Sequence, residues 1–288
     1  MPGRPAVAVE PIRSEDIDAV AKYLNAQLND RVPVADWARV IGEDWHRVAP
    51  NHGFLLRSGD RVVGACLAIY STRVIDGVDE GICNLGALCV DEDFRVHVVR
   101  LLRSVLKQDG WTFTDLSPSG NVIALNERLG FQYLDTATAV VPGLPIPHIR
   151  RRIRVITDPE QIESRLEGAA RTILREHRNA AAAHHVLLTC GEDQCYLIYR
   201  RTSRKRLPVF ASILYVSDQA AFARLADGLP GHLLRHGVLA SFAELRIVGT
   251  TPPRSTHLKQ PRPKMYKSTH LGPENIDYLY SELTSLAW

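Results

Sequence analysis

A group of cations follows an apolar run at residues 85–90, at the point where a helix is expected to begin. Arg95, His97 and Arg100 belong to this group. The amide N–H groups of the first helical turn point outward without a partner in the helix, and the helix dipole adds positive potential there. Such a helix start can bind phosphate, and cationic side chains can add charged hydrogen bonds. The simpler alternative is a solvated helix start that binds nothing.

Three further positions are candidates for proton transfer. Asp115 and Ser117 alternate along a strand expected around 111–116, so both project from one face of it. Glu80 stands at the start of the preceding strand. A carboxylate within hydrogen-bond reach of an acceptor can act as a general base. Lone carboxylates on strands are more commonly structural or solvated.

Two other basic clusters lie further along the chain. The first comprises Arg150, Arg151, Arg152 and Arg154, and the second comprises Arg200, Arg201, Arg204, Lys205 and Arg206. Either could contact a coenzyme phosphate, a carrier protein or RNA, although such runs are more often solvated turns and linkers. No aromatic residues are interleaved with them as in nucleic-acid platforms, so a nucleic-acid partner is not expected. His184 and His185 lack the third ligand and the spacing of a metal site, so no metal is predicted.

The first half of the chain is expected to position these residues on a mixed sheet. Hydrophobic spacing, N-cap residues and turn residues predict the elements in order. They are a strand at 6–12, helices from 14 and over 34–45, strands at 53–57, 61–72 and up to 90, a helix from 98 to 110, a strand at 111–116, a helix at 121–129, and paired strands at 131–134 and 138–141.

A second passage repeats this order of elements after a proline-rich linker. The predicted elements are a strand at 154–156, a helix at 159–178, strands at 184–189, 194–201 and 208–216, a helix at 219–236, a strand at 238–248, an irregular stretch at 250–267 and a last helix at 273–286. We therefore expect a domain at 1–141, a linker at 142–152 and a second, degenerate copy at 153–288.

Length and composition agree with two globular domains. The chain has 288 residues, of which 45% are hydrophobic and 23% charged, and no apolar run is long enough to span a bilayer. A net charge of +3 is too mild for a dedicated nucleic-acid binder. Residues 1–6 lack the apolar core of a secretory signal, and five scattered cysteines do not form a disulfide framework. These features predict a soluble, cytoplasmic protein that does not associate with membranes; its oligomeric state stays open.

The segment 85–131 resembles the core of the GNAT N-acetyltransferase superfamily. An apolar strand runs into Asp-Glu-Asp-Phe-Arg at 91–95, followed by an amphipathic helix, a second strand and a short helix that closes on Leu129-Gly130-Phe131. The stretch from Asn121 to Phe131 looks like the family's Asn-x-x-Ala-x-x-x-Tyr-Glu-Lys-Leu-Gly-Phe segment in shortened form. The resemblance implies an α/β fold with a mixed, mostly antiparallel sheet flanked by helices. It also implies acetyl-CoA or another acyl-CoA as co-substrate.

The resemblance assigns donor-binding roles to several positions. In the family a loop written Arg/Gln-x-x-Gly-x-Gly/Ala holds the coenzyme pyrophosphate, and Asn121 opens the short helix. The corresponding loop reads Arg95-Val96-His97-Val98-Val99-Arg100, so Val98 and Arg100 stand at its glycine positions. Main-chain amides of Leu88, Cys89 and Val90 would face the thioester oxygen and the pantetheine arm.

The resemblance also bears on the acid and the base. Asn126 stands where many relatives have a tyrosine that protonates the leaving thiolate, and an asparagine can only donate a hydrogen bond there. Asn84 stands where some relatives have a glutamate, and it cannot act as a base. Glu80, Asp115 and Ser117 are therefore the alternative positions for deprotonating an acceptor amine.

Three functions follow from the resemblance. The first is an N-acyltransferase, most simply an N-acetyltransferase, in which the amine of a small molecule attacks acyl-CoA directly. The second is a transferase that takes acyl groups from acyl-carrier protein or aminoacyl groups from tRNA, for which the basic clusters would dock the carrier. The third is a catalytically silent binding protein that keeps the ligand site.

Overall fold

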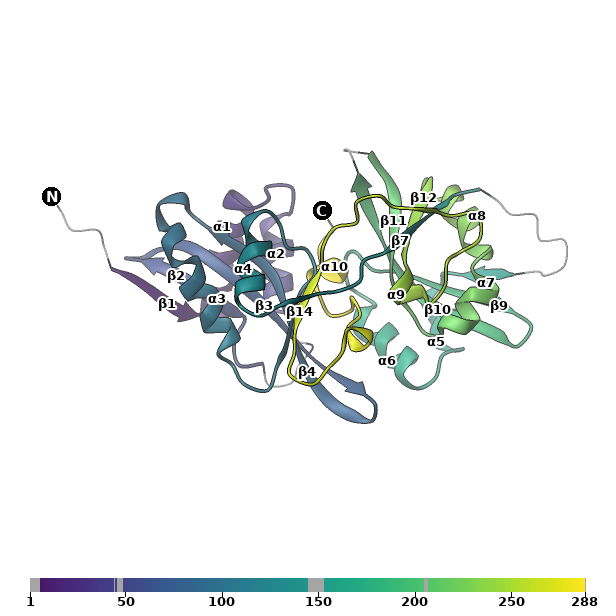
Figure 1. Ribbon diagram of the computed structural model, residues 1–288, viewed down its shortest axis with the longest axis horizontal. Coiled ribbons are helices and arrows are strands. Elements are labelled where there is room, and N and C mark those ends of the chain that lie inside the picture. The colour runs from purple at the N-terminus through teal and green to yellow at the C-terminus, as the bar shows by residue number, and fades with distance from the viewer. Residues whose placement is uncertain (1–5, 44, 46–48, 145–152, 205–206, 288) are drawn as a thin grey trace.

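The computed structural model describes residues 6–43, 45, 49–144, 153–204 and 207–287. Two lobes lie side by side along the longest axis, and each is built on a seven-stranded sheet (Figure 1). Most of the predicted linker, at 145–152, lies outside the described residues. None of the helices in the described ranges has the length and apolar character needed to span a membrane.

The first sheet has the strand order β1-β2-β3-β4-β5-β14-β6. Its strands are β1 (Val7–Pro11), β2 (Gly53–Ser58), β3 (Arg61–Ile75), β4 (Val78–Val90), β5 (Thr112–Asp115), β14 (Met265–Lys267) and β6 (Gln132–Tyr133). Its helices are α1 (Ile17–Gln27), α2 (Val34–Ile41), α3 (Val98–Leu106) and α4 (Asn121–Arg128). The elements predicted up to residue 129 are thus confirmed, although α2 and α3 end before the predicted residues 45 and 110.

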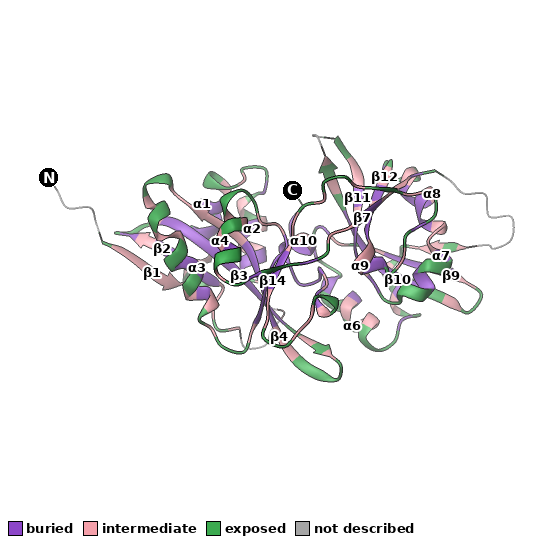
Figure 2. Cartoon of the chain, viewed as in Figure 1, coloured by how far each residue is buried: buried purple, intermediate pink, exposed green. Residues whose placement is uncertain are grey.

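Helices cover both faces of this sheet because their apolar stripes match the alternation of the strands. Leu24 of α1 and Trp37 of α2 pack with Leu67 on one face. Leu101 of α3 packs with Cys66 on the other. Figure 2 shows buried strands inside each lobe and an exposed tip on the long β3–β4 hairpin.

Strands β4 and β5 separate shortly after they meet. They pair in parallel from Ile82 opposite Thr112 to Asn84 opposite Thr114, and β5 then ends. Gly86 is the extra residue of a β-bulge in β4, which bends a strand locally. In the described chain β4 continues to Val90 paired only with β3. A gap therefore opens beside β4 beyond Asn84.

The second sheet repeats the first. Its order is β13-β7-β12-β11-β10-β9-β8, with strands β8 (Arg154–Ile156), β9 (His184–Cys190), β10 (Asp193–Arg204), β11 (Leu207–Val216), β12 (Ala240–Glu244), β7 (Thr138–Pro142) and β13 (Thr256–His257). Its parallel pair, β11 with β12, occupies the place of β4 with β5, and its other pairs are antiparallel. The prediction of a duplicated, mixed and mostly antiparallel α/β fold is confirmed.

The helices of the second half are shorter than predicted. They are α5 (Pro159–Glu163), α6 (Gly168–His177), α7 (Gln219–Leu225), α8 (Gly228–Arg235), α9 (Leu245–Val248) and α10 (Glu282–Ser285). The prediction of one helix over 159–178 is wrong because Gly168 adopts φ +53°, outside the helical region. The helix predicted over 219–236 likewise divides at Asp227, and the strand predicted over 238–248 ends in α9.

The two sheets exchange strands. The predicted pairing of 131–134 with 138–141 is wrong because β7 pairs with all five residues of β12, whereas β6 offers only two. The stretch 250–267, predicted to be irregular, contributes β13 to the second sheet and β14 between β5 and β6 of the first. The division into domains 1–141 and 153–288 stays a prediction. The two sheets do not coincide with it, because each sheet contains a strand from the other half of the chain.

The chain end does not form the single helix predicted over 273–286. A 3₁₀ turn at Pro273–Asn275 is followed by an extended stretch and then by α10. Tyr278, Leu279 and Tyr280 are all buried, Tyr278 in one hydrophobic cluster and Leu279 and Tyr280 in another, and an extended chain can send successive side chains to opposite sides in this way. This segment runs between the lobes (Figure 1).

Candidate active site

The gap beside β4 contains a cavity of about 270 Å³. One wall is the freed part of β4, from Leu85 to Leu88, and the other is the turn after β5 from Ser117 to Ser119. The lining is completed by Leu28, Asn29, Leu102, Asp115, Val122 of α4 and Arg262. The N–H and C=O groups of β4 that point away from β3 can therefore form hydrogen bonds with an extended ligand, as at the edge of a sheet.

A larger cavity of about 590 Å³ lies between the two halves. It is lined from the second half by residues of β10, β11 and β12, and from the first half by Leu116 and Ser117. Asn29, Ser117 and Arg262 line both cavities, so the two adjoin. The arrangement has room for two different ligands that meet near Ser117.

Glu282 of α10 lies next to this junction: it lines neither cavity, but it contacts Ser117, which lines both. It is fully buried, and its Oε1 accepts a hydrogen bond of 2.7 Å from the Ser117 hydroxyl. Its Oε2 has no hydrogen-bond partner among the described residues. The Glu282 amide lies 3.4 Å from Oδ1 of Asn84, the last β4 residue paired with β5. Glu282 therefore occupies the point where the strands separate.

Asp115 places a second carboxyl group on the other side of the gap. It is 6% exposed, and its Oδ2 accepts a hydrogen bond of 2.7 Å from Nδ2 of Asn126. Burial raises the pKa of Asp115 to about 6, against the lowering effect of the Asn126 hydrogen bond. Burial, together with the charge of Asp115, raises the pKa of Glu282 to about 7. Glu282 can thus gain or lose a proton near neutral pH.

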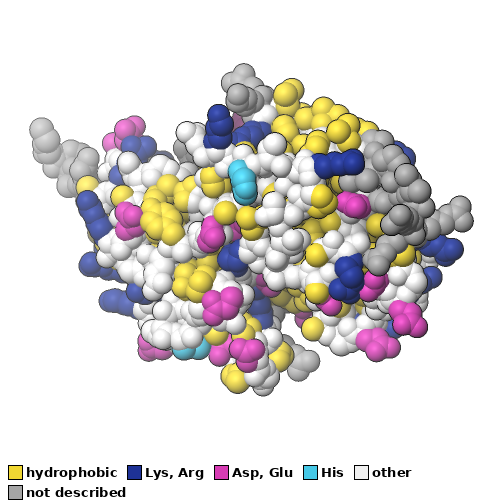
Figure 3. Space-filling model, turned by 45° about the vertical axis from the view of Figure 1, so that its right-hand side comes forward, with side chains coloured by type: hydrophobic (Ala, Val, Ile, Leu, Met, Phe, Trp, Pro, Cys, Tyr) yellow, Lys and Arg dark blue, Asp and Glu magenta, His cyan; other side chains and the backbone are white. Residues whose placement is uncertain are grey.

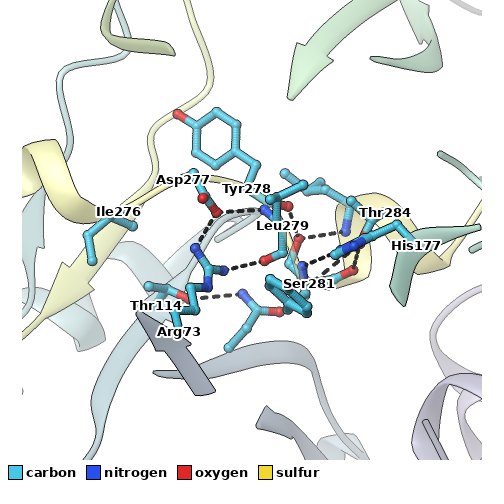
Figure 4. A network of polar contacts seen from close by, with 12 residues as sticks. Arg73, Thr114, His177, Ile276, Asp277, Tyr278, Leu279, Ser281 and Thr284 are labelled. Atoms are coloured by element: carbon cyan, nitrogen blue, oxygen red, sulfur yellow. Dashed lines mark hydrogen bonds and ion pairs between the residues drawn. The ribbon is translucent and has the colours of Figure 1, made fainter. Parts of the chain in front are cut away.

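A polar network anchors the segment that carries Glu282 (Figure 4). Arg73 of β3 forms an ion pair with Asp277 and donates to the carbonyl of Leu279. The amide of Tyr280 donates to Nε2 of buried His177 at 3.1 Å, which assigns the ring proton to Nδ1, 3.0 Å from the Ile173 carbonyl. Burial lowers the pKa of His177 to about 4, so the ring is neutral near pH 7.

The backbone turns sharply just before Glu282. Tyr280 has φ +53°, a strained conformation for a residue with a side chain. Ser281 caps α10, since its hydroxyl accepts from the Leu283 amide at 3.2 Å and donates to the Tyr278 carbonyl at 2.7 Å. The surrounding contacts hold this turn and thereby fix the direction of the Glu282 side chain.

The structure brings several predicted residues to the gap. Asp115, Ser117 and Leu88 line the cavity. Asn84 is buried beside it, and its Nδ2 lies 3.2 Å from the Thr114 hydroxyl. Asn126 is fully buried and holds Asp115, so its observed contact is to a carboxylate.

Cys89 and Val90 lie further along β4, beyond the lining of the cavity. Cys89 packs against the core on the α1 face, and burial raises the pKa of its thiol. Val90 pairs with Gly64 and packs on the α3 face. Their donor-binding role stays a prediction, and the main chain that lines the cavity is that of Leu85–Leu88.

The segment from Arg95 to Arg100 forms a 3₁₀ turn followed by α3. Here the Val98 amide donates to the Arg95 carbonyl, and Nη1 of Arg100 donates to the Val7 carbonyl at 3.3 Å. Arg95, Val96, Val99, Arg100 and the more distant Asn121 are exposed, whereas His97 and Val98 are half-buried. Because β1 is the opposite edge strand, Arg100 is directed away from the gap. Pyrophosphate binding here stays a prediction.

Glu80 lies toward the other end of β4. Its Oε2 is 2.7 Å from Nε2 of His270, and it lines neither cavity. Five residues of strand separate it from Leu85, roughly 16 Å at the usual rise. This separation favours a structural contact with His270 over a role at the gap.

The basic clusters have different locations. Arg150, Arg151, Arg152, Lys205 and Arg206 lie outside the described residues, while Arg200 and Arg204 line the larger cavity. On the face drawn in Figure 3, Lys and Arg side chains are spread among Asp and Glu side chains. Within the described ranges no three His, Cys, Asp or Glu side chains are grouped as a metal site.

Two residues of this site were not predicted from the sequence. Glu282 lies 165 positions from Ser117, its hydrogen-bond partner, and Arg262 belongs to a stretch predicted to be irregular. The sequence offered only a weak signal for Glu282: it is an acidic residue that follows Ser281, a possible helix cap, in an otherwise apolar chain end.

Comparison with known proteins identifies similar structures. No family model matches the chain, and no curated protein matches its sequence. A GCN5-related N-acetyltransferase from Anabaena variabilis superposes with a TM-score of 0.56 at 11% identity, covering 91% of this chain and 72% of that one. Another from Kribbella flavida gives 0.56 at 14% identity, covering 91% and 71%. Eis1 from Mycobacterium abscessus gives 0.54 at 16% identity, covering 90% and 73%.

Proposed function

The chain has a GNAT-like fold, and from this premise we propose that it is an N-acyltransferase. It transfers an acyl group from acetyl-CoA or another acyl-CoA to the amine of a small-molecule acceptor. The observation that carries the proposal is the buried Glu282 carboxylate, hydrogen-bonded to Ser117 where two cavities adjoin, beside separated parallel strands.

The donor fits the cavity beside β4. Its acyl carbonyl would supply the electrophile, and its pantetheine arm carries amide groups that match the main-chain groups of Leu85–Leu88. Amide N–H groups on this freed edge can donate to the oxygen that gains negative charge. This role uses the backbone and therefore asks little of the side chains.

The acceptor amine approaches from the larger cavity, and Glu282 receives its proton. A new bond joins the acceptor nitrogen to the acyl carbon, the carbon–sulfur bond breaks, and the proton passes from nitrogen to the Glu282 carboxylate and then to water. The Ser117 hydroxyl lines both cavities and donates to Oε1, so it can pass its own proton to the buried carboxylate as it accepts one from the amine. Asn126 keeps Asp115 in place and does not deliver a proton to the departing thiolate.

Thiol release from acetyl-CoA with a panel of amines tests this proposal. Glu282→Gln should lower the rate by about 100-fold or more, because it removes a general base while keeping the shape. Acetyl-CoA should bind this variant with nearly unchanged affinity by calorimetry. Glu192→Gln, at an exposed position, is the matched control. Equal rates for Glu282→Gln and the wild type would refute the role of Glu282.

A carrier-protein donor is the second candidate, favoured by the start of α3. The Val98 amide is engaged by Arg95, and Arg100 points toward β1, so fewer groups remain for a pyrophosphate. A pantetheine arm carried by acyl-carrier protein, or an aminoacyl end carried by tRNA, needs no such cradle. Transfer from either carrier that free coenzyme A fails to inhibit would support this candidate. Absence of transfer from all three donors would leave the silent binding protein.

A further inference from the structure

The larger cavity has an excess of positive charge. Five cationic side chains and one carboxylate are found among its described lining residues. They are Arg31, Arg200, Arg204, Arg262, Lys264 and Glu244. A cavity lined by one sign of charge concentrates ligands of the opposite sign.

The Glu244 carboxylate does not neutralise the charge of the arginines, because it already forms ion pairs with other cations. Glu244 is 5% exposed, and its Oε2 lies 2.6 Å from Nζ of Lys264. Its Oε1 lies 3.5 Å from Nη2 of Arg246 and accepts from the Tyr278 hydroxyl. Lys264 and Arg246 thus neutralise Glu244 and leave the remaining arginines of the cavity in excess.

Two of these arginines, Arg200 and Arg262, repel each other electrostatically. Arg200 is 4% exposed, and its Nη2 donates to the Leu286 carbonyl at 3.2 Å. Burial, with the like charge of Arg262, lowers the pKa of Arg200 to about 10, so it remains cationic at neutral pH. The charge of Glu282 acts in the opposite direction. An anion near Arg200 and Arg262 would relieve their repulsion.

Arg204 extends this cationic wall. Its Nη2 donates to the Gln260 carbonyl at 3.4 Å, and its guanidinium lies 5.8 Å from the centre of the Phe242 ring. Arg31 and Arg262 are exposed at the cavity and form no ion pair with the described residues. Guanidinium groups bind carboxylate and phosphate oxygens in a bidentate manner, which neutral ligands cannot match.

We propose that this cavity binds an acceptor that carries an anionic group, a carboxylate or a phosphate, in addition to its amine. Arg200, Arg204 and Arg262 hold the anionic group, and the amine is thereby directed to Glu282 at the junction. This inference rests on the proposed function for the fate of the amine. Binding of the anionic group by these arginines does not depend on the proposed transfer reaction.

Matched pairs of probes test the site. L-phenylalanine against L-phenylalaninamide removes a carboxylate, and glucosamine 6-phosphate against glucosamine removes a phosphate. Each pair keeps its amine. Calorimetry at millimolar concentration measures binding, and thiol release from acetyl-CoA measures transfer. At least one anionic member should bind roughly tenfold more tightly than its neutral partner, as expected for charged hydrogen bonds.

Variants connect this preference to the cavity. Arg204→Gln combined with Arg262→Gln removes two of the three guanidinium groups at positions that are not buried, which protects the fold, and should reduce the preference to within about twofold. Arg200→Met tests the buried member, with circular dichroism to confirm folding. Arg235→Gln, on the exposed side of α8, should keep the preference.

The outcomes separate this inference from the proposed function. Neutral probes that bind as well as their anionic partners, no heat from either anionic probe, or a preference unchanged in the double variant would each overturn the anion site. If an anionic probe binds but acetyl-CoA gives no heat, the anion site stands and the coenzyme donor fails. If acetyl-CoA reacts equally with neutral and anionic amines, the transferase stands and the anion site fails.

Discussion

At the scale of single residues, Glu282 and Asp115 reach one gap from distant parts of the chain. Both are buried, yet their surroundings differ. Asp115 accepts a hydrogen bond from the Asn126 amide, which favours its charged form, whereas Oε2 of Glu282 has no hydrogen-bond partner in the described part of the chain. Asp115 therefore ionises first and opposes the ionisation of Glu282. Two carboxyl groups with separated pKa values can hold different roles, one structural and one catalytic.

The pH dependence of transfer follows from Glu282. Its pKa of about 7 means that the basic form is lost on acidification, so the rate at low acceptor concentration should rise from pH 6 and level off near pH 8. A rate series in buffers of constant ionic strength measures this. Glu282→Gln should lose the part of this rise that is centred near pH 7, and keep only the part due to the acceptor amine. A wild-type profile that is flat over the range would exclude Glu282 as the base.

At the scale of elements, the extended segment before α10 decides the geometry of the site. A single helix over 273–286 is the local expectation from the sequence. Burial of Tyr278, Leu279 and Tyr280 in succession outweighs that local preference. Propensity is a weak guide where tertiary contacts are this dense.

The hydrogen bond from the Tyr280 amide to His177 makes the stability of the segment before α10 depend on pH. The folded-state pKa of about 4 lies below the ordinary value of 6.5, so the stabilising contribution is complete above about pH 6.5 and is lost as the pH falls toward 4. The loss amounts to about 2 to 3 kcal/mol by pH 4.5. The difference in unfolding free energy between wild type and His177→Gln should shrink by this amount from pH 7 to pH 4.5.

This comparison isolates His177 from the buried acids. Asp115 and Glu282 have raised pKa values, so their ionisation costs stability above those values, and acidification relieves that cost. Both proteins share this opposing effect, and it cancels in the difference. A difference that stays constant between the two pH values would contradict the neutral, buried state of His177.

At the scale of the whole molecule, the duplicated order of strands was predictable, but the exchange between the sheets was not. Period-two alternation and turn residues located β2 to β4 and their counterparts β9 to β11, because these signals are local. Strand β14 has three residues and joins β5 across about 150 positions, and β6 and β13 have two residues each. Such short strands carry no periodicity, and their partners are chosen by tertiary packing.

The exchange implies that neither sheet is complete without the chain end. A chain that stops at residue 250 loses β13, β14 and α10, together with the buried side chains of Met265 and Tyr278. Each such loss costs roughly 2 to 5 kcal/mol. The thermal midpoint should fall by more than about 10 °C, measured by circular dichroism. An unchanged midpoint would show that the halves fold without the exchanged segments.

The central claim is that the gap between β4 and β5 holds an acyl-CoA arm. The measurement that tests it most directly is a calorimetric titration of acetyl-CoA into wild type, Val122→Trp and Ala124→Trp. Val122 lines the cavity, and Ala124 is exposed on the same helix. We expect micromolar binding to wild type and Ala124→Trp, and binding weaker by about 30-fold or more to Val122→Trp. No heat with wild type, or equal affinity for Val122→Trp, would contradict the account.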